Sequence, residues 1–183
     1  MRKWILVILL CGLQIPVFSQ IQFSPGSKPG FGKRLYFGGN FGLQLGGVTY
    51  IDASPLVGYM ITRNLSAGVG ITYRYYNDKY VNYKTNIYGG RLFIRHNVTF
   101  MNLPLFLYSE YEDLSFELAS YNPVTKDYNL TREWVPSLFV GGGLFQPIGN
   151  RAGFTIMALY NIIYDAQRSP YNSPWVFRVG FTL

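Results

Sequence analysis

The chain has 183 residues, of which 18% are aromatic and only 14% are charged, and its formal net charge is +7. Disordered chains are poor in aromatic residues, and soluble domains carry about 25% charged residues, so this composition excludes a disordered chain. One cysteine and one histidine exclude a disulfide scaffold, a cysteine-ligated zinc site and a His-rich metal site. We therefore expect one folded domain with no metal and no other cofactor.

The N-terminal segment has the layout of a secretory signal peptide. Two basic residues precede a short apolar segment, and Ser19 stands at position −1 if cleavage falls before Gln20. The apolar segment is too short for a transmembrane helix, which needs about 20 residues. Cys11 offers the alternative of a lipoprotein signal, although a bulky leucine precedes it. The sequence thus predicts a signal peptide over 1–19 and a single domain over 20–183.

The remaining chain alternates between apolar and polar or small residues. In the first such segment Phe37 and Phe41 lie on one face, and Asn40 and Gln44 lie on the other. A period of two predicts a strand between two different environments. Each segment has about ten residues, the length that a tilted strand needs to cross a bilayer. Eight segments share this pattern: 34–45, 51–61, 66–75, 88–95, 105–112, 134–144, 153–162 and 175–183.

Three of these segments depart from a regular alternation. Pro55 in the second segment would remove a ladder hydrogen bond or mark a bulge. The sixth and seventh segments are less regular because apolar side chains fall on the predicted polar face: Phe139, Phe145, Met157 and Leu159.

The predicted connections alternate in length. Short ones are expected at 62–64, 97–103 and 147–150, and longer polar ones at 77–84, 113–133 and 165–174, while Gly46-Gly47 makes the first connection short as well. In transmembrane barrels the short turns face the periplasm and the long loops face outward. The sequence therefore predicts an all-β fold, an eight-stranded antiparallel up-and-down transmembrane β-barrel. The alternative is a soluble secreted sandwich or a lipocalin-like barrel.

Aromatic residues near the strand ends favour the membrane barrel, because aromatic girdles lie at membrane interfaces. The last segment carries a row of aromatic or apolar residues on one face: Trp175, Phe177, Val179, Phe181 and Leu183. This row resembles the C-terminal insertion signal of bacterial outer-membrane barrels, with leucine in place of the usual phenylalanine.

With 59–75 and 134–143 as its most similar stretches, the predicted domain resembles small eight-stranded outer-membrane proteins of the OmpX-like and OmpA transmembrane type. Its Tyr- and Asn-rich texture resembles that of Bacteroidota proteins. The resemblance implies a bacterial outer-membrane location, surrounding lipid and insertion by the barrel-assembly machinery.

Charged residues fall on the predicted inner faces. They are the cations Arg34, Arg74, Arg91, Arg95 and Arg178 and the acids Asp52, Glu110 and Glu112. The interior of an eight-stranded barrel is just wide enough for side chains to fill it, and unpaired charges there are very unfavourable. We therefore predict a paired network, with inward glycines leaving room for the arginines. The surplus of positive charge supports an alternative, a narrow polar conduit or ligand pocket. Loss of Glu110 would destabilise a plug but change the conductance of a conduit.

The sequence supports three hypotheses for the function. The leading hypothesis is a structural or interaction role with a protein partner in the envelope, and 113–133 is the candidate contact segment. The alternatives are a small pore and a lipid-acting barrel enzyme. The sole histidine, His96, is predicted at the periplasmic rim, the wrong end for lipid A deacylase chemistry, so we expect no enzyme. Without a basic cluster, we expect no nucleic-acid partner.

Overall fold

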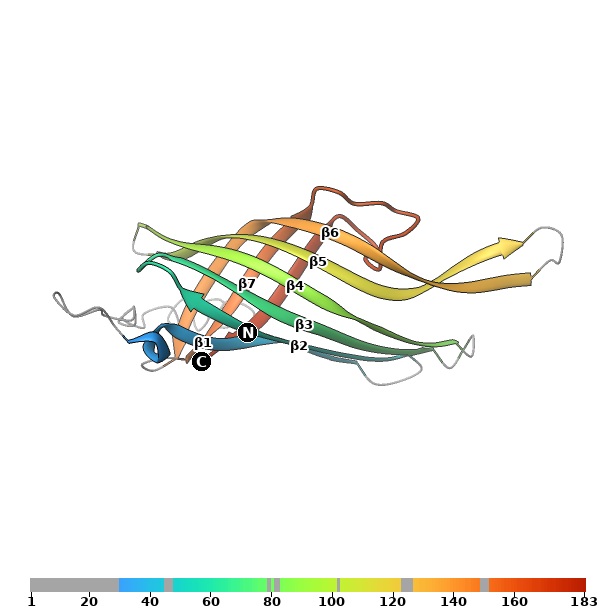
Figure 1. Cartoon of the computed structure of the whole chain (residues 1–183), viewed down its shortest axis with the longest axis horizontal. Coiled ribbons are helices and arrows are strands. Elements are labelled where there is room, and N and C mark those ends of the chain that lie inside the picture. Colours follow the sequence, from blue (N-terminus) through green and yellow to red (C-terminus); the bar gives the residue numbers. More distant parts are fainter. Residues whose placement is uncertain are drawn as a thin grey trace, which may run out of the picture.

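A computed structural model of the protein describes residues 30–44, 48–78, 80, 83–101, 103–122, 127–148 and 152–183. The predicted signal peptide, 1–19, and the predicted first turn, 46–47, lie outside these residues. The described part forms eight antiparallel strands closed into a barrel (Figure 1). Each strand pairs with its neighbours in the sequence and β8 returns to β1. The predicted eight-stranded antiparallel up-and-down barrel is confirmed.

The strands differ in length more than the sequence pattern predicted. A short 3-10 helix, η1 (Phe31–Arg34), precedes the barrel. Within the described ranges no helix is long and apolar enough to cross a membrane. The strands are β1 (Leu35–Gln44), β2 (Val48–Met60), β3 (Leu65–Asp78), β4 (Tyr83–Phe100), β5 (Leu103–Asn122), β6 (Asp127–Ile148), β7 (Ala152–Asn161) and β8 (Trp175–Thr182).

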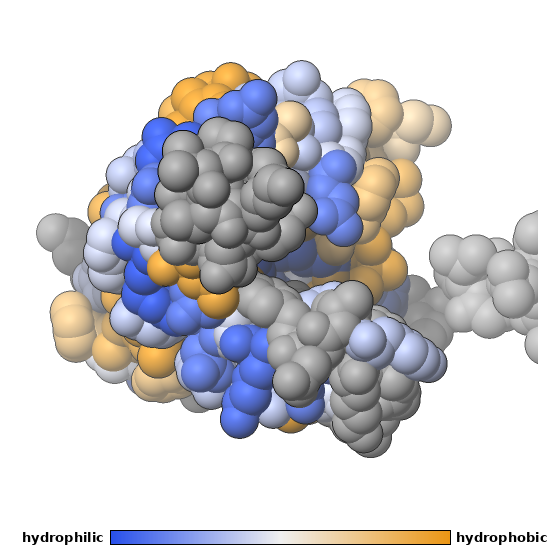
Figure 2. Space-filling model, turned by 90° about the vertical axis from the view of Figure 1, so that its right-hand side faces the viewer, coloured by the Kyte–Doolittle hydropathy of each residue, from blue (hydrophilic) through white to orange (hydrophobic). Residues whose placement is uncertain are grey.

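Alternation along the strands sorts the side chains between the outside and the inside of the barrel. On β3, Val69 and Ile71 are 55% and 64% exposed, whereas Thr72 and Arg74 are buried. The other strands follow the same rule, so the outer wall is apolar and aromatic. Figure 2, a view onto one end of the barrel, shows hydrophobic residues around the periphery and hydrophilic residues nearer the middle. A protein that folds in water buries its apolar faces inside, so it would show the opposite arrangement.

Apolar side chains also occupy part of the interior. Phe139, Met157 and Leu159, which interrupted the polar pattern of two predicted strands, are buried inside the barrel. They join an interior cluster with Tyr36, Met60, Phe93, Phe106 and Tyr108. The interior is therefore filled by an aromatic and aliphatic layer as well as by charges.

Pro55 interrupts the ladder and introduces no bulge. Pairing between β2 and β3 stops after Ala53↔Tyr73 and resumes at Leu56↔Gly70, with the register unchanged. Proline lacks the N–H group that a ladder bond needs, which explains the gap. On the other side Pro55 lies opposite Gly39, whose φ of 151° is a conformation that favours glycine.

The prediction of a long loop over 113–133 is wrong. The β5–β6 hairpin stays paired as far as Asn122↔Asp127, and Figure 1 shows it projecting well beyond the body of the barrel. Continuous pairing satisfies the backbone N–H and C=O groups of this polar segment, so strand geometry continues outside the apolar wall. The predicted connections 97–103 and 77–84 are also too long, because β4 begins at Tyr83 and continues to Phe100.

Two other predicted connections agree with the structure. Residues 61–64 turn between β2 and β3, and 162–174 form the connection between β7 and β8, which includes the predicted loop 165–174. The turns after β2 and β4 lie at one end of the barrel, and the long hairpins lie at the other (Figure 1).

Candidate functional site: the ion pairs inside the barrel

Six of the charged residues predicted for the interior form one chain of alternating ion pairs. Asp52 lies 2.9 Å from Arg74, which lies 3.9 Å from Glu112. Arg178 joins the two glutamates, at 3.7 Å from Glu112 and 2.6 Å from Glu110. The chain ends at Arg91, 3.6 Å from Glu110. Three arginines thus meet three carboxylates, and the chain as a whole is neutral.

Strand register explains how these side chains meet. The two glutamates stand two residues apart on β5, so both point inward. Gly70 on β3 lies directly opposite Arg91 on β4. A Cβ atom on Gly70 would lie 2.7 Å from the Nε of Arg91, so only glycine leaves the arginine its path. Arg91 passes over this glycine and donates a hydrogen bond to the backbone carbonyl of Ser54, the residue before Pro55.

Tyr171, in the connection between β7 and β8, completes the network. Its hydroxyl donates to Glu112 and accepts hydrogen bonds from Arg74 at 2.8 Å and from Arg178 at 3.2 Å. Burial, together with the neighbouring Glu112 carboxylate, raises the pKa of Tyr171 to about 12. Sequence analysis missed this residue because one tyrosine in a polar connection carries no periodic signal. These hydrogen bonds hold the connection between β7 and β8 against the ion-pair chain.

Two predicted members, Arg34 and Arg95, are not part of this chain of ion pairs. Arg34 belongs to η1 and so precedes the first barrel strand. Arg95 lies four residues beyond Arg91 on β4, about 13 Å along the strand, in a different layer of the interior. The ion-pair chain is neutral, and the surplus of positive charge in the described interior is that of Arg95.

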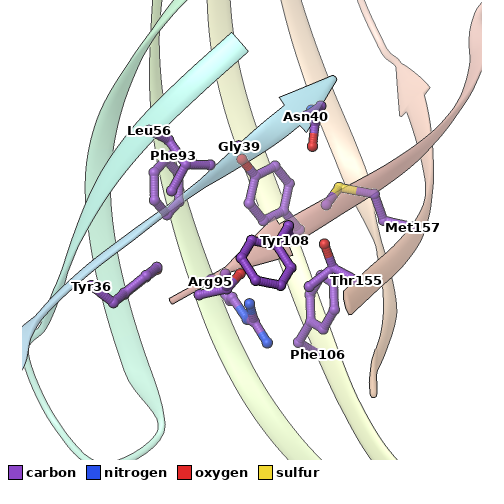
Figure 3. A pocket seen from close by; sticks show the side chains of 12 residues that line it. Tyr36, Gly39, Asn40, Leu56, Phe93, Arg95, Phe106, Tyr108, Thr155 and Met157 are labelled. Atoms are coloured by element: carbon purple, nitrogen blue, oxygen red, sulfur yellow. The ribbon is translucent and has the colours of Figure 1, made fainter. Parts of the chain in front are cut away.

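Arg95 is held by aromatic rings and an amide. Its guanidinium carbon lies 4.0 Å from the centre of the Phe106 ring and 5.4 Å from that of Phe145, and its Nε donates to Asn97 at 3.0 Å. Such cation–π contacts are strongest where water is excluded. Figure 3 shows Arg95 among Tyr36, Tyr108 and other inward side chains that surround a cavity of about 20 Å³. That volume is close to the space that one water molecule needs.

The described residues offer few groups for catalysis or metal binding. His96 is exposed and follows Ile94 on the outer face of β4, and it lies opposite Leu65 beside the β2–β3 turn. In the described ranges no three His, Cys, Asp or Glu residues gather into a possible metal site. Glu110 and Glu112, the two fully buried glutamates of the described residues, are both paired with arginines, so the arrangement is suited to filling and bracing the barrel.

Two aromatic pairs lie on the outer wall. Tyr88 and Trp134 approach edge to face with ring centres 6.2 Å apart, and Tyr160 and Trp175 do so at 5.0 Å. Next to the first pair, the guanidinium carbon of Arg132 lies 5.2 Å from the centre of the Tyr88 ring. Its Nη2 lies 3.1 Å from the Glu117 carboxylate. The residues of the predicted insertion signal face outward along β8 and its end: Trp175, Phe177, Val179, Phe181 and Leu183.

Comparison with known proteins finds a structural likeness among solved structures. No family model matches the chain, and no curated protein matches it. Among solved structures, the chain is similar to the N-terminal β-barrel domain of Pseudomonas aeruginosa OprF, with a TM-score of 0.48 and 14% sequence identity. The alignment covers 81% of this chain and 96% of the OprF domain.

Proposed function

We propose that the protein is an integral component of a bacterial outer membrane, with a structural or interaction role and no catalytic activity. The observation that carries this proposal is the inversion of the barrel. Apolar side chains are exposed around its outer wall, whereas the buried charged side chains lie in its interior, in ion pairs and hydrogen bonds beside an aromatic and aliphatic layer. Lipid is the solvent that suits such a wall.

The two aromatic pairs on the outer wall support the placement in a bilayer. Tyrosine and tryptophan prefer the boundary between hydrocarbon and water, where ring and polar group are both satisfied. The outward row on β8, from Trp175 to Leu183, is the segment that we expect the barrel-assembly machinery to recognise. The origin of the protein in Bacteroidota, which its Tyr- and Asn-rich sequence resembles, stays a prediction.

We favour a plug over a pore. The neutral ion-pair chain and the layer around Arg95 occupy successive levels of the interior, and the cavity beside Arg95 holds about one water. A hydrated ion needs a wider continuous path. Reconstituted in a planar bilayer, the protein should therefore conduct no steady ionic current. Its overexpression should leave lipid A and phospholipids unaltered.

Fractionation and heat-modifiability test the proposal together. Expressed in a Gram-negative host, the full chain should be found in outer-membrane fractions. Its unboiled band should migrate faster on a detergent gel than the boiled band, because a folded barrel stays compact in the detergent. Soluble protein in the periplasm without such a shift would overturn the proposal. A steady current from the folded protein would favour the pore.

A further inference from the structure

The seam that closes the barrel is split over half of its length. β1 and β8 share three ladder pairs, from Gly38↔Thr182 to Asn40↔Gly180, and a pair of backbone hydrogen bonds between Phe37 and Leu183. Beyond Asn40 both strands continue, yet no further pairing joins them in the described residues. By contrast, β7 and β8 are paired over the whole of Trp175–Thr182. The wall is therefore open on one side, towards the end with the long hairpins.

A cavity of about 650 Å³ occupies this split. Its volume falls in the range of small-molecule sites, about 300–1,000 Å³. On the membrane side it is lined by Phe41, Phe177 and Val179, which are 70%, 77% and 62% exposed. On the inner side it reaches Arg74 and Arg178. One continuous surface thus leads from the apolar outer wall to the charged interior.

Two arginines present their guanidinium groups to the cavity. Arg74, Arg178 and Asp52 line it, and Arg74 is paired with Asp52 at 2.9 Å. Glu110 and Glu112, which balance the arginines in the ion-pair chain, are fully buried behind them and do not line the cavity. Residues 170–172 of the connection between β7 and β8 also line the cavity. The negatively charged head group of a ligand would accept hydrogen bonds from these arginines, and its apolar part would match the three outward side chains.

We propose that the split between β1 and β8 binds an anionic single-chain amphiphile drawn from the surrounding membrane. Its acyl chain lies along Phe41, Phe177 and Val179, and its negatively charged head lies towards Arg74 and Arg178. This inference rests on the proposed membrane location, because only lipid surroundings bring such a ligand to the outer wall.

Photocrosslinking tests the proposal on the full chain folded in an uncharged detergent. The probe is palmitic acid with a photoreactive diazirine in its chain, used at mildly alkaline pH so that the carboxyl is ionised. We expect crosslinks concentrated in 40–42 and 170–180. Unlabelled palmitic acid should compete with the probe several-fold better than cetyl alcohol, which has the same chain and no charge.

Two variants separate the roles of head and chain. Asn172 lines the cavity from an exposed position in the loop, so Asn172→Asp adds a negative charge without touching the ion pairs. We expect crosslinking to fall about fivefold, as for like charges near a protein surface. The matched control Asn64→Asp makes the same change in the exposed turn at the other end and should have no effect. Val179→Trp adds bulk in the split and should lower crosslinking of the acid.

The outcomes distinguish this inference from the proposed function. Each variant is first checked for the heat-dependent gel shift. Crosslinks spread evenly around a folded barrel, equal competition by acid and alcohol, or equal effects of N172D and N64D would overturn the binding site alone. A chain that is soluble and shows no gel shift would overturn the membrane barrel itself.

Discussion

Replacing Glu110 with glutamine removes one negative charge from the middle of the ion-pair chain and keeps the shape of the side chain. The buried Glu110 carboxylate lies 2.6 Å from Arg178 and 3.6 Å from Arg91, and it accepts a hydrogen bond from Tyr108 at 2.6 Å. At an effective dielectric constant of about 20, the two charge attractions amount to about 6 and 5 kcal/mol. These are gross values, before the desolvation of the charges is subtracted.

The net loss falls mainly on Arg91. In the variant Arg178 keeps Glu112 at 3.7 Å, and the glutamine carbonyl still accepts hydrogen bonds. Arg91 keeps the Ser54 carbonyl, but its Nε has no hydrogen-bond partner in the part of the chain that the structure describes. Removing one partner of a buried ion pair costs about 3–5 kcal/mol. We expect E110Q to lower the free energy of unfolding by that amount.

Guanidinium titration of the protein refolded in micelles, followed by tryptophan fluorescence, measures this loss. The matched control is Glu133→Gln, which breaks the pair with Arg168 at 3.0 Å, where both side chains are about half exposed. Such surface pairs contribute under about 1 kcal/mol. Equal unfolding midpoints for E110Q and E133Q would refute the bracing role. If E110Q changed ionic current and left stability intact, the interior would be a conduit.

Three further predictions follow from the wall, the glycines and the loop. Gly70→Ala places a Cβ 2.7 Å from the Arg91 Nε and 2.9 Å from the Pro55 carbonyl, so it should destabilise the barrel by about 1–3 kcal/mol; Gly90→Ala, whose Cβ meets nothing closer than 3.9 Å, should be nearly neutral in the same titration. Leu92→Lys on the outer wall, 59% exposed, should cost about 2–4 kcal/mol in lipid vesicles, whereas an unchanged stability would indicate a wall facing water. Because the pKa of Tyr171 is raised from 10.0 to about 12, its contribution to stability is complete below pH 10 and is lost as the pH rises towards 12; the stability difference between the wild type and Tyr171→Phe should shrink over that interval, and a constant difference would contradict the buried phenol.

The period of two was sufficient to predict the faces of the strands. It placed Val69 and Leu92 outside and Arg74 and Glu112 inside, because one residue of shift would exchange the two faces of a strand. It was sufficient even where the pattern weakened, since Phe139 lies inside as its position required. The alternation predicts whether a side chain points outward or inward, but it does not predict which residue that side chain contacts.

Other features needed the register, which no single strand encodes. Arg91 and Arg95 have the same residue type and the same face of β4, yet one pairs with Glu110 and the other stacks on Phe106. The contacts of each arginine depend on which residues of β5 lie beside it in the barrel. The extension of the β5–β6 hairpin was missed because its polar residues resemble a loop, although backbone pairing continues to Asn122.

The ion-pair chain has a consequence for the lifetime of the folded protein. Arg178 and Glu110 are 68 positions apart in the sequence, and Tyr171 and Arg74 are 97 apart. Contacts across such long loops form late in folding, because the entropy of loop closure opposes them until neighbouring strands are in place. Interactions that are absent from the transition state slow unfolding and leave the folding rate nearly unchanged. We therefore expect loss of these pairs to shorten the time that the barrel stays folded, while its rate of assembly is preserved.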